Sequence, residues 1–331
     1  MPSIFDTTHL ELWIAFGVII VVLLAIDLLV ANRHAHRISL TEAAVWSAVW
    51  IGLALLFNGA VWWLLGGKPA MEFLTGYLVE KSLSVDNLFV FVIIFRFFGV
   101  QAQFQHRVLF WGVIGAIVLR IVMITAGVAL VMQFHFVMYL FGAFLVYTAI
   151  KLSLTHDRPM DPQRSPAIRL ANRLLRIAPG DHGERFWVRL DGRRRATTLM
   201  LVLLVVEISD VIFAVDSIPT IFGITTDPFV LITSNIFAIL GLRSLYFLLA
   251  GTIDRFHYLS HALSLVLFFI GVKMLIADLV AIPTWVSLCV VGTVLGLGVG
   301  LSLARSRRLA RQAGLAASAA AAQADPSIEE K

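Results

Sequence analysis

Acidic residues recur inside the apolar stretches of this 331-residue sequence, and they form two similar clusters. Each cluster consists of an acid, five residues, an aspartate, and then a small amide or hydroxyl residue. The two stretches read Glu80-Lys-Ser-Leu-Ser-Val-Asp86-Asn87 and Asp210-Val-Ile-Phe-Ala-Val-Asp216-Ser217. Carboxylate, amide and hydroxyl oxygens are the ligands that hard divalent cations such as Mn²⁺, Mg²⁺ and Ca²⁺ prefer, and carboxylates also carry protons. The clusters therefore predict cation or proton chemistry and are unsuited to binding an anion.

The surrounding composition indicates that these acids lie inside a membrane. Hydrophobic residues make up 59% of the chain and charged residues only 14%, whereas a soluble domain is nearer 45–50% apolar and about 25% charged. Apolar runs of roughly 20 residues, each long enough to cross the hydrocarbon core as a helix, recur along the chain. We therefore predict an all-α, polytopic bundle of about nine transmembrane helices, at residues 10–31, 43–65, 72–98, 107–131, 134–153, 197–221, 229–250, 258–280 and 283–304.

A carboxylate at the centre of a membrane helix is energetically unfavourable by about 2.5–3.5 kcal/mol on insertion scales. Five of them would together exceed the roughly 5–15 kcal/mol by which a typical domain is stable, so protons, bases or bound cations must neutralise them. Glu207 lies three residues before Asp210 and so shares its helix face. We predict a metal site formed by Glu80, Asp86, Asn87, Glu207, Asp210, Asp216 and Ser217.

Local helix distortions would help to form this site. Unwinding at residues 82–84 would let Glu80 and Asp86 converge, and Pro219 cannot donate a hydrogen bond to the carbonyl of Val215, which is thereby freed beside Asp216. Carbonyls freed at membrane depth are tolerated where they line a cavity or bind an ion.

Three basic residues, Arg120, Arg243 and Lys273, are predicted to balance part of the acidic charge. They lie well along their own helices, so we expect a net negative centre. The alternative is that acids and bases form buried salt bridges that only hold helices together. Asp27 could be part of the charged set or merely a residue at the membrane interface.

Polar landmarks repeat in register across the two halves of the chain. Leu119-Arg120 matches Leu242-Arg243, and Ile150-Lys151 matches Val272-Lys273. The first repeat spans residues 72–153 and the second spans 197–280, and an odd number of crossings separates their first helices. This predicts an inverted-topology repeat, which is typical of secondary transporters with a substrate site near the midplane.

The basic residues indicate how the chain is oriented. Most of the 26 Lys and Arg lie in alternate connections, which predicts an N-terminus outside and a C-terminus in the cytoplasm of a plasma (inner) membrane protein. The excess of positive charge is thus a topology signal and does not indicate nucleic acid. We expect helices in 1–153, an Arg-rich cytoplasmic loop at 154–196 lying against anionic headgroups, helices in 197–304, and a low-complexity, partly disordered tail at 305–331.

No soluble-enzyme motif occurs in the sequence: H-E-x-x-H, a P-loop, G-x-S-x-G and a dinucleotide fingerprint are all missing. With a single cysteine, Cys289, the chain has no intrachain disulfide and no cysteine-based zinc site. We expect a protein that is not an enzyme and has no tightly bound cofactor, whose partners are a metal-ion substrate and the lipid bilayer. The sequence indicates no particular protein partner.

The paired motifs resemble those of the TerC family of integral membrane proteins. The likeness rests on Leu-Val-Glu80 through Leu-Phe89 and on Val-Glu207 through Ser-Ile-Pro219, and it extends over roughly residues 10–281. Within the family, the sequence is most similar to the Alx-type branch, and that resemblance implies manganese export from the cytoplasm. Family membership also implies an association with tellurium resistance. Tellurite is an oxyanion that an acidic midplane would repel, so we expect such an effect to be indirect.

The leading hypothesis is therefore a secondary transporter that exports a divalent cation, Mn²⁺ first among them, through an acidic site between the helices at 72–98 and 197–221. Two alternatives stay open. One is a membrane scaffold or stress-complex subunit whose buried charges are structural. The other is a cation channel.

Overall fold

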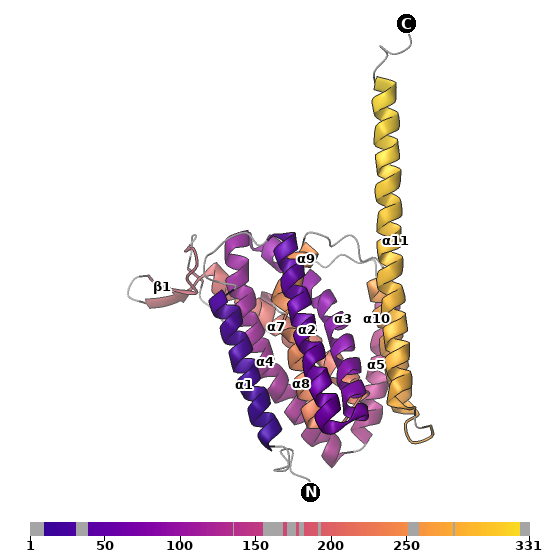
Figure 1. Cartoon of the computed structure of the whole chain (residues 1–331). Helices are drawn as coiled ribbons and strands as arrows, with labels where there is room; N and C mark the ends of the chain where they lie inside the picture. The colour runs from indigo at the N-terminus through magenta and orange to yellow at the C-terminus, as the bar shows by residue number, and fades with distance from the viewer. Residues whose placement is uncertain are drawn as a thin grey trace.

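A computed structural model describes residues 10–30, 39–134, 136–154, 168–170, 177–178, 182–190, 193–250, 258–280 and 282–324. The chain is a bundle of membrane-length helices with one small hairpin at its side (Figure 1). The helices are α1 (Leu10–Val30), α2 (Leu40–Leu65), α3 (Gly67–Phe97), α4 (Ala102–Gln133), α5 (Phe136–Leu154), α7 (Thr198–Phe222), α8 (Pro228–Ile239), α9 (Leu242–Ala250), α10 (Leu259–Leu275) and α11 (Thr284–Ala324). The strands are β1 (Trp187–Leu190) and β2 (Arg193–Ala196).

The predicted all-α polytopic fold is confirmed. Seven of the described segments are long and apolar enough to cross a membrane. The two other predicted crossings are α3, which carries several charges, and α10, which has 17 residues. Both lie alongside the other helices in the bundle (Figure 1). The start of α1 and the end of α11 lie at opposite ends of the molecule, as an odd number of crossings requires.

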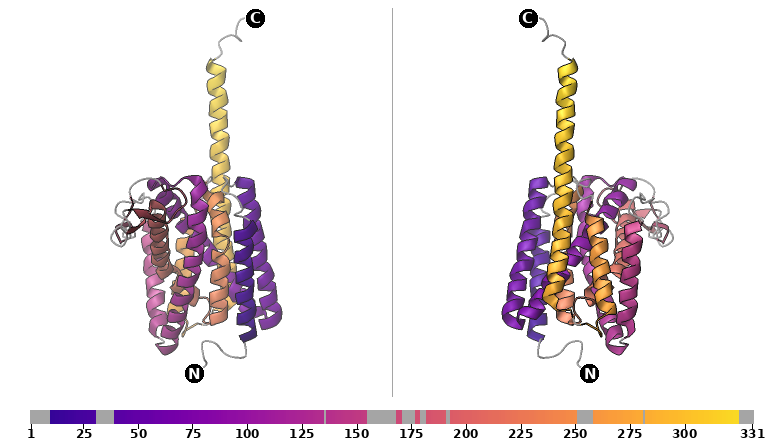
Figure 2. Two further views of the ribbon diagram at one scale, coloured as in Figure 1. Left: turned by 90° about the vertical axis from the view of Figure 1, so that its left-hand side faces the viewer. Right: turned by 90° about the vertical axis from the view of Figure 1, so that its right-hand side faces the viewer.

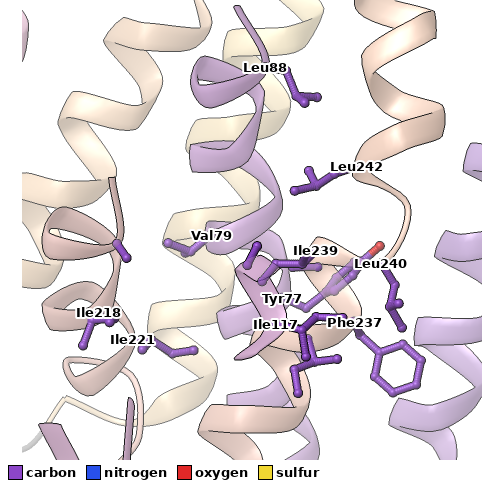
Figure 3. Close-up of a cluster of buried hydrophobic side chains, with 14 of the residues drawn as sticks. Tyr77, Val79, Leu88, Ile117, Ile218, Ile221, Phe237, Ile239, Leu240 and Leu242 are labelled. Atoms are coloured by element: carbon purple, nitrogen blue, oxygen red, sulfur yellow. The ribbon is translucent and has the colours of Figure 1, made fainter. Parts of the chain in front are cut away.

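The seventh predicted crossing is broken and forms the centre of the bundle. Helix α8 ends at Ile239, and α9 begins at Leu242 after a turn at Leu240–Gly241. In the most apolar 18-residue stretch of Pro228–Ala250, 94% of the residues are buried, against 17% in the corresponding stretches of α1 and α2. The segment's own apolar side chains pack in one cluster with those of α3, α4 and α7 (Figure 3). The cluster includes Phe237, Ile239 and Leu242 of this segment and Val79, Leu88, Ile117, Ile218 and Ile221 of the surrounding helices. The outer helices therefore present their apolar faces to lipid, while α8 packs only against protein.

Helices of the two predicted repeats pack against one another, and the inverted repeat itself stays a prediction. Helix α3 contacts α7, α4 contacts α8 and α9, and α5 contacts α10. The pair α5 and α10 runs antiparallel with closely approaching backbones. A Cβ at Gly142 would lie 3.0 Å from the carbonyl oxygen of Gly271, and one at Gly271 would lie 2.9 Å from that of Gly142. About two turns away, Ser264 Oγ donates a hydrogen bond of 2.7 Å to the carbonyl of Ala149. In the alignment of the two repeats, Gly142 corresponds to Ser264 and Gly271 to Ala149, so exchanging the repeats converts one of these contacts into the other.

One local expectation was wrong, and two further segments contain regular structure that was not predicted. Helix α3 is continuous through residues 82–84, where Ser82 and Ser84 each donate a 2.7 Å hydrogen bond to the carbonyl four residues earlier. The Arg-rich segment is not only an irregular linker, because residues 187–196 include an antiparallel pair of strands. The tail is helical as far as Ala324, since alanine-rich sequence strongly favours helix. Helix α11 therefore extends well beyond the bundle (Figures 1 and 2).

Candidate functional site

A buried arginine joins four helices at the centre of the bundle. Arg120 on α4 is 1% exposed, and its guanidinium forms an ion pair with Glu80 on α3, which is 2% exposed. The same guanidinium donates hydrogen bonds to Ser217 Oγ at 3.0 Å and to Asn235 Oδ1 at 2.8 Å. Its Nε lies 3.6 Å from Asp210 Oδ2, which is an ion-pair distance but too long for a hydrogen bond. Four side chains from α3, α7 and α8 thus converge on one cation.

This convergence corrects one expectation and supports another. Arg120 is not remote from the acids, as its position along α4 suggested, but lies between Glu80 and Asp210. These ion pairs put a positive charge between two of the predicted acids, and the charge-balancing role of Arg120 in transport stays a prediction. Small residues allow the helices to approach: a Cβ at Gly76 on α3 would lie 3.0 Å from Ser234 Oγ on α8, next to Asn235.

Glu207 lies one turn before Asp210 on α7, and it forms no ion pair with any base among the described residues. Its Oε2 atom is buried and has no hydrogen-bond partner. The carboxylate points at Gly115 on α4, where any Cβ would overlap it. An unpaired carboxylate oxygen in an apolar setting is unfavourable unless a proton or a cation offsets the charge. Glu207 is therefore the described side chain that most clearly lacks an ionic partner.

A narrow cavity of about 20 Å³ lies against Glu207 and Asp210. Its volume is close to that of a single water molecule. It is lined by Leu88, Phe91, Leu109, Gly112, Val113, Ala116, Val206, Glu207, Asp210, Leu242 and Arg243. The acids are thus adjacent to a small space between α3, α4, α7 and α9, and this conformation has no wide path to them there.

The other two predicted balancing bases have different partners. Arg243, the counterpart of Arg120 in the second repeat, forms an ion pair of 2.5 Å with Asp27 on α1. Asp27 is thus an ion-pair partner rather than an interfacial residue. Lys273 on α10 interacts electrostatically with Glu72, outside the central cluster. Lys81 donates a 3.1 Å hydrogen bond to the carbonyl of Ala238, near the end of α8, where helical carbonyls lack intrahelical donors.

The predicted metal ligands are only partly brought together. Glu80, Asp210 and Ser217 meet at Arg120, Glu207 lies next to them, and Asn87 is buried on α3. The side chains of Asp86 and Asp216 lie outside the described part of the structure. Among the side chains that it does describe, no three His, Cys, Asp or Glu residues are grouped as a metal ion would require. The metal site as a whole stays a prediction.

Two residues of the site, and one buried acid outside it, escaped sequence analysis. Asn235 lies within the apolar run 229–250, and only its polarity there could have singled it out. Gly115 gives no signal without its neighbour Glu207. Glu72 is buried near the start of α3, where its Oε2 accepts a 2.7 Å hydrogen bond from Thr225. Its position at the boundary of a predicted helix concealed it.

Known proteins share both the motifs and most of the chain. The model of the "Integral membrane protein TerC family" matches residues 65–310. An uncharacterized membrane protein of Myxococcus xanthus is 50% identical over 89% of this chain and 93% of its own length. An Escherichia coli K12 protein named "Putative membrane-bound redox modulator Alx" is 51% identical over 85% of this chain and 90% of its own. No solved structure matches the chain. Matches of this extent show that the chain belongs to the TerC family of integral membrane proteins.

Proposed function

We propose that this protein exports a divalent cation, Mn²⁺ first among them, from the cytoplasm by alternating access around the acidic cluster of α3 and α7. The observation that carries the proposal is the surplus of buried carboxylates. Glu80 and Asp210 share one guanidinium, that of Arg120, and Glu207 lies one turn from Asp210 on α7, which gives a formal charge of −2 from three acids and one base. Such a charge at membrane depth calls for a cation or for protons.

The donor set favours a hard cation. The oxygens at the cluster come from carboxylates, from the Ser217 hydroxyl and from the Asn235 amide, and they suit Mn²⁺, Mg²⁺ or Ca²⁺ better than a soft metal. Asp86 and Asp216, on the same helices, are proposed to complete the ligand set. The choice of Mn²⁺ within this class rests on the resemblance to the Alx-type branch.

Arg120 supplies a simple account of the metal-free state. Its guanidinium holds Glu80 and Asp210 together when no metal is present, and an arriving divalent cation competes with it for the same carboxylates. A bound divalent cation would bring the formal charge of Glu80, Glu207, Asp210 and Arg120 from −2 to zero. The reorientation step therefore need not expose uncompensated carboxylates to the membrane interior.

The inverted packing of the two repeats supports alternating access. Helices α3 and α7 lie at the interface between the repeats, which is where transporters of this architecture place the substrate. In the proposed orientation in the inner membrane, the N-terminus lies outside and the C-terminal end of α11 lies in the cytoplasm. The cavity beside Glu207 would then face the cytoplasmic half, where the exported ion must first bind.

One observation favours the rival proposal of a scaffold with structural charges. Arg120 is held by Glu80, Ser217 and Asn235 at once, which is a well-satisfied network. Glu207 argues against a purely structural set, because its buried Oε2 contributes to no ion pair or hydrogen bond. The name of the Escherichia coli relative points to redox modulation. A chain with one cysteine cannot cycle an intrachain dithiol, so we propose that any redox effect follows from altered metal supply.

Purified protein in liposomes distinguishes these functions. We expect saturable Mn²⁺ flux that depends on the protein and that Mg²⁺ or Ca²⁺ inhibits only at higher concentration. A scaffold would give the flux of empty liposomes under every ion gradient. A channel would give unitary currents in a planar bilayer, which an alternating-access transporter does not.

A further inference from the structure

The hairpin of β1 and β2 has one strongly basic, exposed face. In the antiparallel register, Trp187 lies opposite Ala196 and Arg189 lies opposite Arg194. Opposed residues share a face, and alternate residues along a strand share it too. Trp187, Arg189 and Arg194 therefore lie on the same side of the hairpin. All three are exposed, Trp187 by 50%.

The opposed arginines on this face destabilise the hairpin when only water surrounds it. Like charges directly opposite each other destabilise a strand pair, and a two-stranded hairpin is marginally stable at best. Neither strand contains an acidic residue. The nearby Glu184 is already paired with Arg107 at 3.2 Å. Among the described residues of the hairpin no acid offsets the repulsion of the Arg189–Arg194 pair, and an anion bound at this face would do so.

The base of the hairpin is fixed to the bundle. The amide of Ala178 donates a 2.8 Å hydrogen bond to the carbonyl of Ala196, and that of Thr197 donates one of 3.0 Å to the carbonyl of Phe186. The guanidinium of Arg107 on α4 lies 5.3 Å from the centre of the Phe186 ring. The hairpin is therefore held in a defined place rather than suspended freely.

That place is beside the bundle, level with one end of the helices. The hairpin projects sideways near the end from which α11 emerges (Figures 1 and 2). In a chain that spans a bilayer, a sideways projection at the level of the helix ends lies next to the lipid headgroups. Tryptophan is enriched at this depth, and arginine binds phosphate groups through paired hydrogen bonds.

We propose that the hairpin face formed by Trp187, Arg189 and Arg194 binds anionic phospholipid headgroups of the adjacent leaflet. Arg189 and Arg194 would contact the phosphates, and Trp187 would insert its ring at the headgroup boundary. Lipid phosphates would then remove the repulsion between the opposed arginines, so binding also stabilises the strand pair.

Lipid binding at this face would also affect the proposed transport site, because the hairpin is directly connected to the helix that carries it. Strand β2 leads directly into Thr197, which caps α7 by accepting a hydrogen bond of 3.3 Å from the amide of Met200. Helix α7 carries Glu207 and Asp210. Only this consequence for transport rests on the proposed function, whereas the binding itself does not.

Hydrogen–deuterium exchange of the full-length protein in nanodiscs tests the proposal without any transport assay. The discs contain phosphatidylcholine alone or an equal mixture with phosphatidylglycerol, and the amides of residues 187–196 are followed. We expect exchange of these amides to be about tenfold slower in the anionic discs. Exchange that is the same in both discs would overturn the proposal.

Two variants with the same change in charge make the test specific. Arg189→Gln/Arg194→Gln should lose the dependence on phosphatidylglycerol while exchanging no faster than wild type in neutral discs, because removing the repulsion does not unfold the hairpin. Lys68→Gln/Arg308→Gln removes two exposed charges elsewhere and should keep the wild-type response. Retained protection in the first variant would contradict the proposal. Protection in neutral discs by an added RNA oligonucleotide, but not by phosphatidylglycerol, would show a nucleic-acid surface instead.

Discussion

Arg120 forms an ion pair with Glu80 across α4 and α3, and both side chains are almost completely buried, at 1% and 2% exposure. The matched residue of the second repeat, Arg243, instead pairs with Asp27 on α1, outside the repeats. The two halves of the bundle therefore use equivalent arginines differently. One neutralises the central acids, and the other attaches α1 to the repeat core.

Arg120→Gln should destabilise the metal-free protein and make it depend more on metal. Removing one partner of a buried ion pair is unfavourable by about 3–5 kcal/mol, because the remaining charge is left uncompensated. Bound Mn²⁺ should offset Glu80 and Asp210 in its place. We therefore expect a lower Tm without metal and a larger Mn²⁺-induced rise in Tm than in wild type, measured in nanodiscs.

Arg243→Gln is the matched control for this prediction. It breaks the ion pair with Asp27 but leaves the pairs of Arg120 with Glu80 and Asp210 intact, so its Tm should fall without any gain in the response to Mn²⁺. Equal metal responses in the two variants would mean that Arg120 has no special relation to a metal site.

Gly115→Ala should impair transport by displacing the Glu207 carboxylate, which a Cβ at this position would overlap. The variant should show at least a tenfold higher KM for Mn²⁺ in a liposome flux assay. Gly112→Ala lies one turn earlier on α4, where the added Cβ would meet Val206 Cγ1 at an ordinary 3.5 Å, and it should transport like wild type. Similar losses in both variants would point to general disruption of α4 packing.

Single cysteines introduced into a Cys289→Ser background test the orientation. Lys68 and Glu184 have side chains that are 78% and 50% exposed, at opposite ends of the bundle. We expect a membrane-impermeant maleimide to label Lys68→Cys in intact cells, and to label Glu184→Cys only after the membrane is opened. The reverse pattern would overturn both the orientation and the proposed direction of export.

The sequence alone was sufficient to predict the helical membrane fold and most helix positions. The bilayer requires each spanning segment to be an apolar helix of a minimum length, so each segment can be recognised from its own composition and length. The break at Leu240–Gly241 was not predicted, because a helix buried on all sides shows no amphipathic pattern to interrupt. The continuous course of α3 was also not predicted. Ser82 and Ser84 donate hydrogen bonds to carbonyls of their own helix, and the sequence does not distinguish such serines from serines that bind an ion.

The candidate site was harder to predict than the fold. Matching motifs identified Glu80, Asp210 and Ser217, which meet in space. Spacing along α4 could not show that Arg120 lies between them, because the crossing of α4 with α3 and α7 depends on tertiary packing. Asn235 and Gly115 contribute through contacts with residues more than 90 positions away, and no local pattern encodes those contacts.

Mn²⁺ flux and thermal stability of Glu207→Gln, measured together in the same preparation, test the central claim most directly. Glu207 has no described ionic partner, so its amide strands no buried base and is easier to accommodate in the membrane than the carboxylate. Glu11→Gln, at an exposed carboxylate in the first turn of α1, is the control and should behave like wild type. We predict that Glu207→Gln loses Mn²⁺ flux while its Tm stays equal to or above that of wild type. Wild-type flux in Glu207→Gln, or a loss of flux together with a lower Tm, would contradict an acidic cation site at this position.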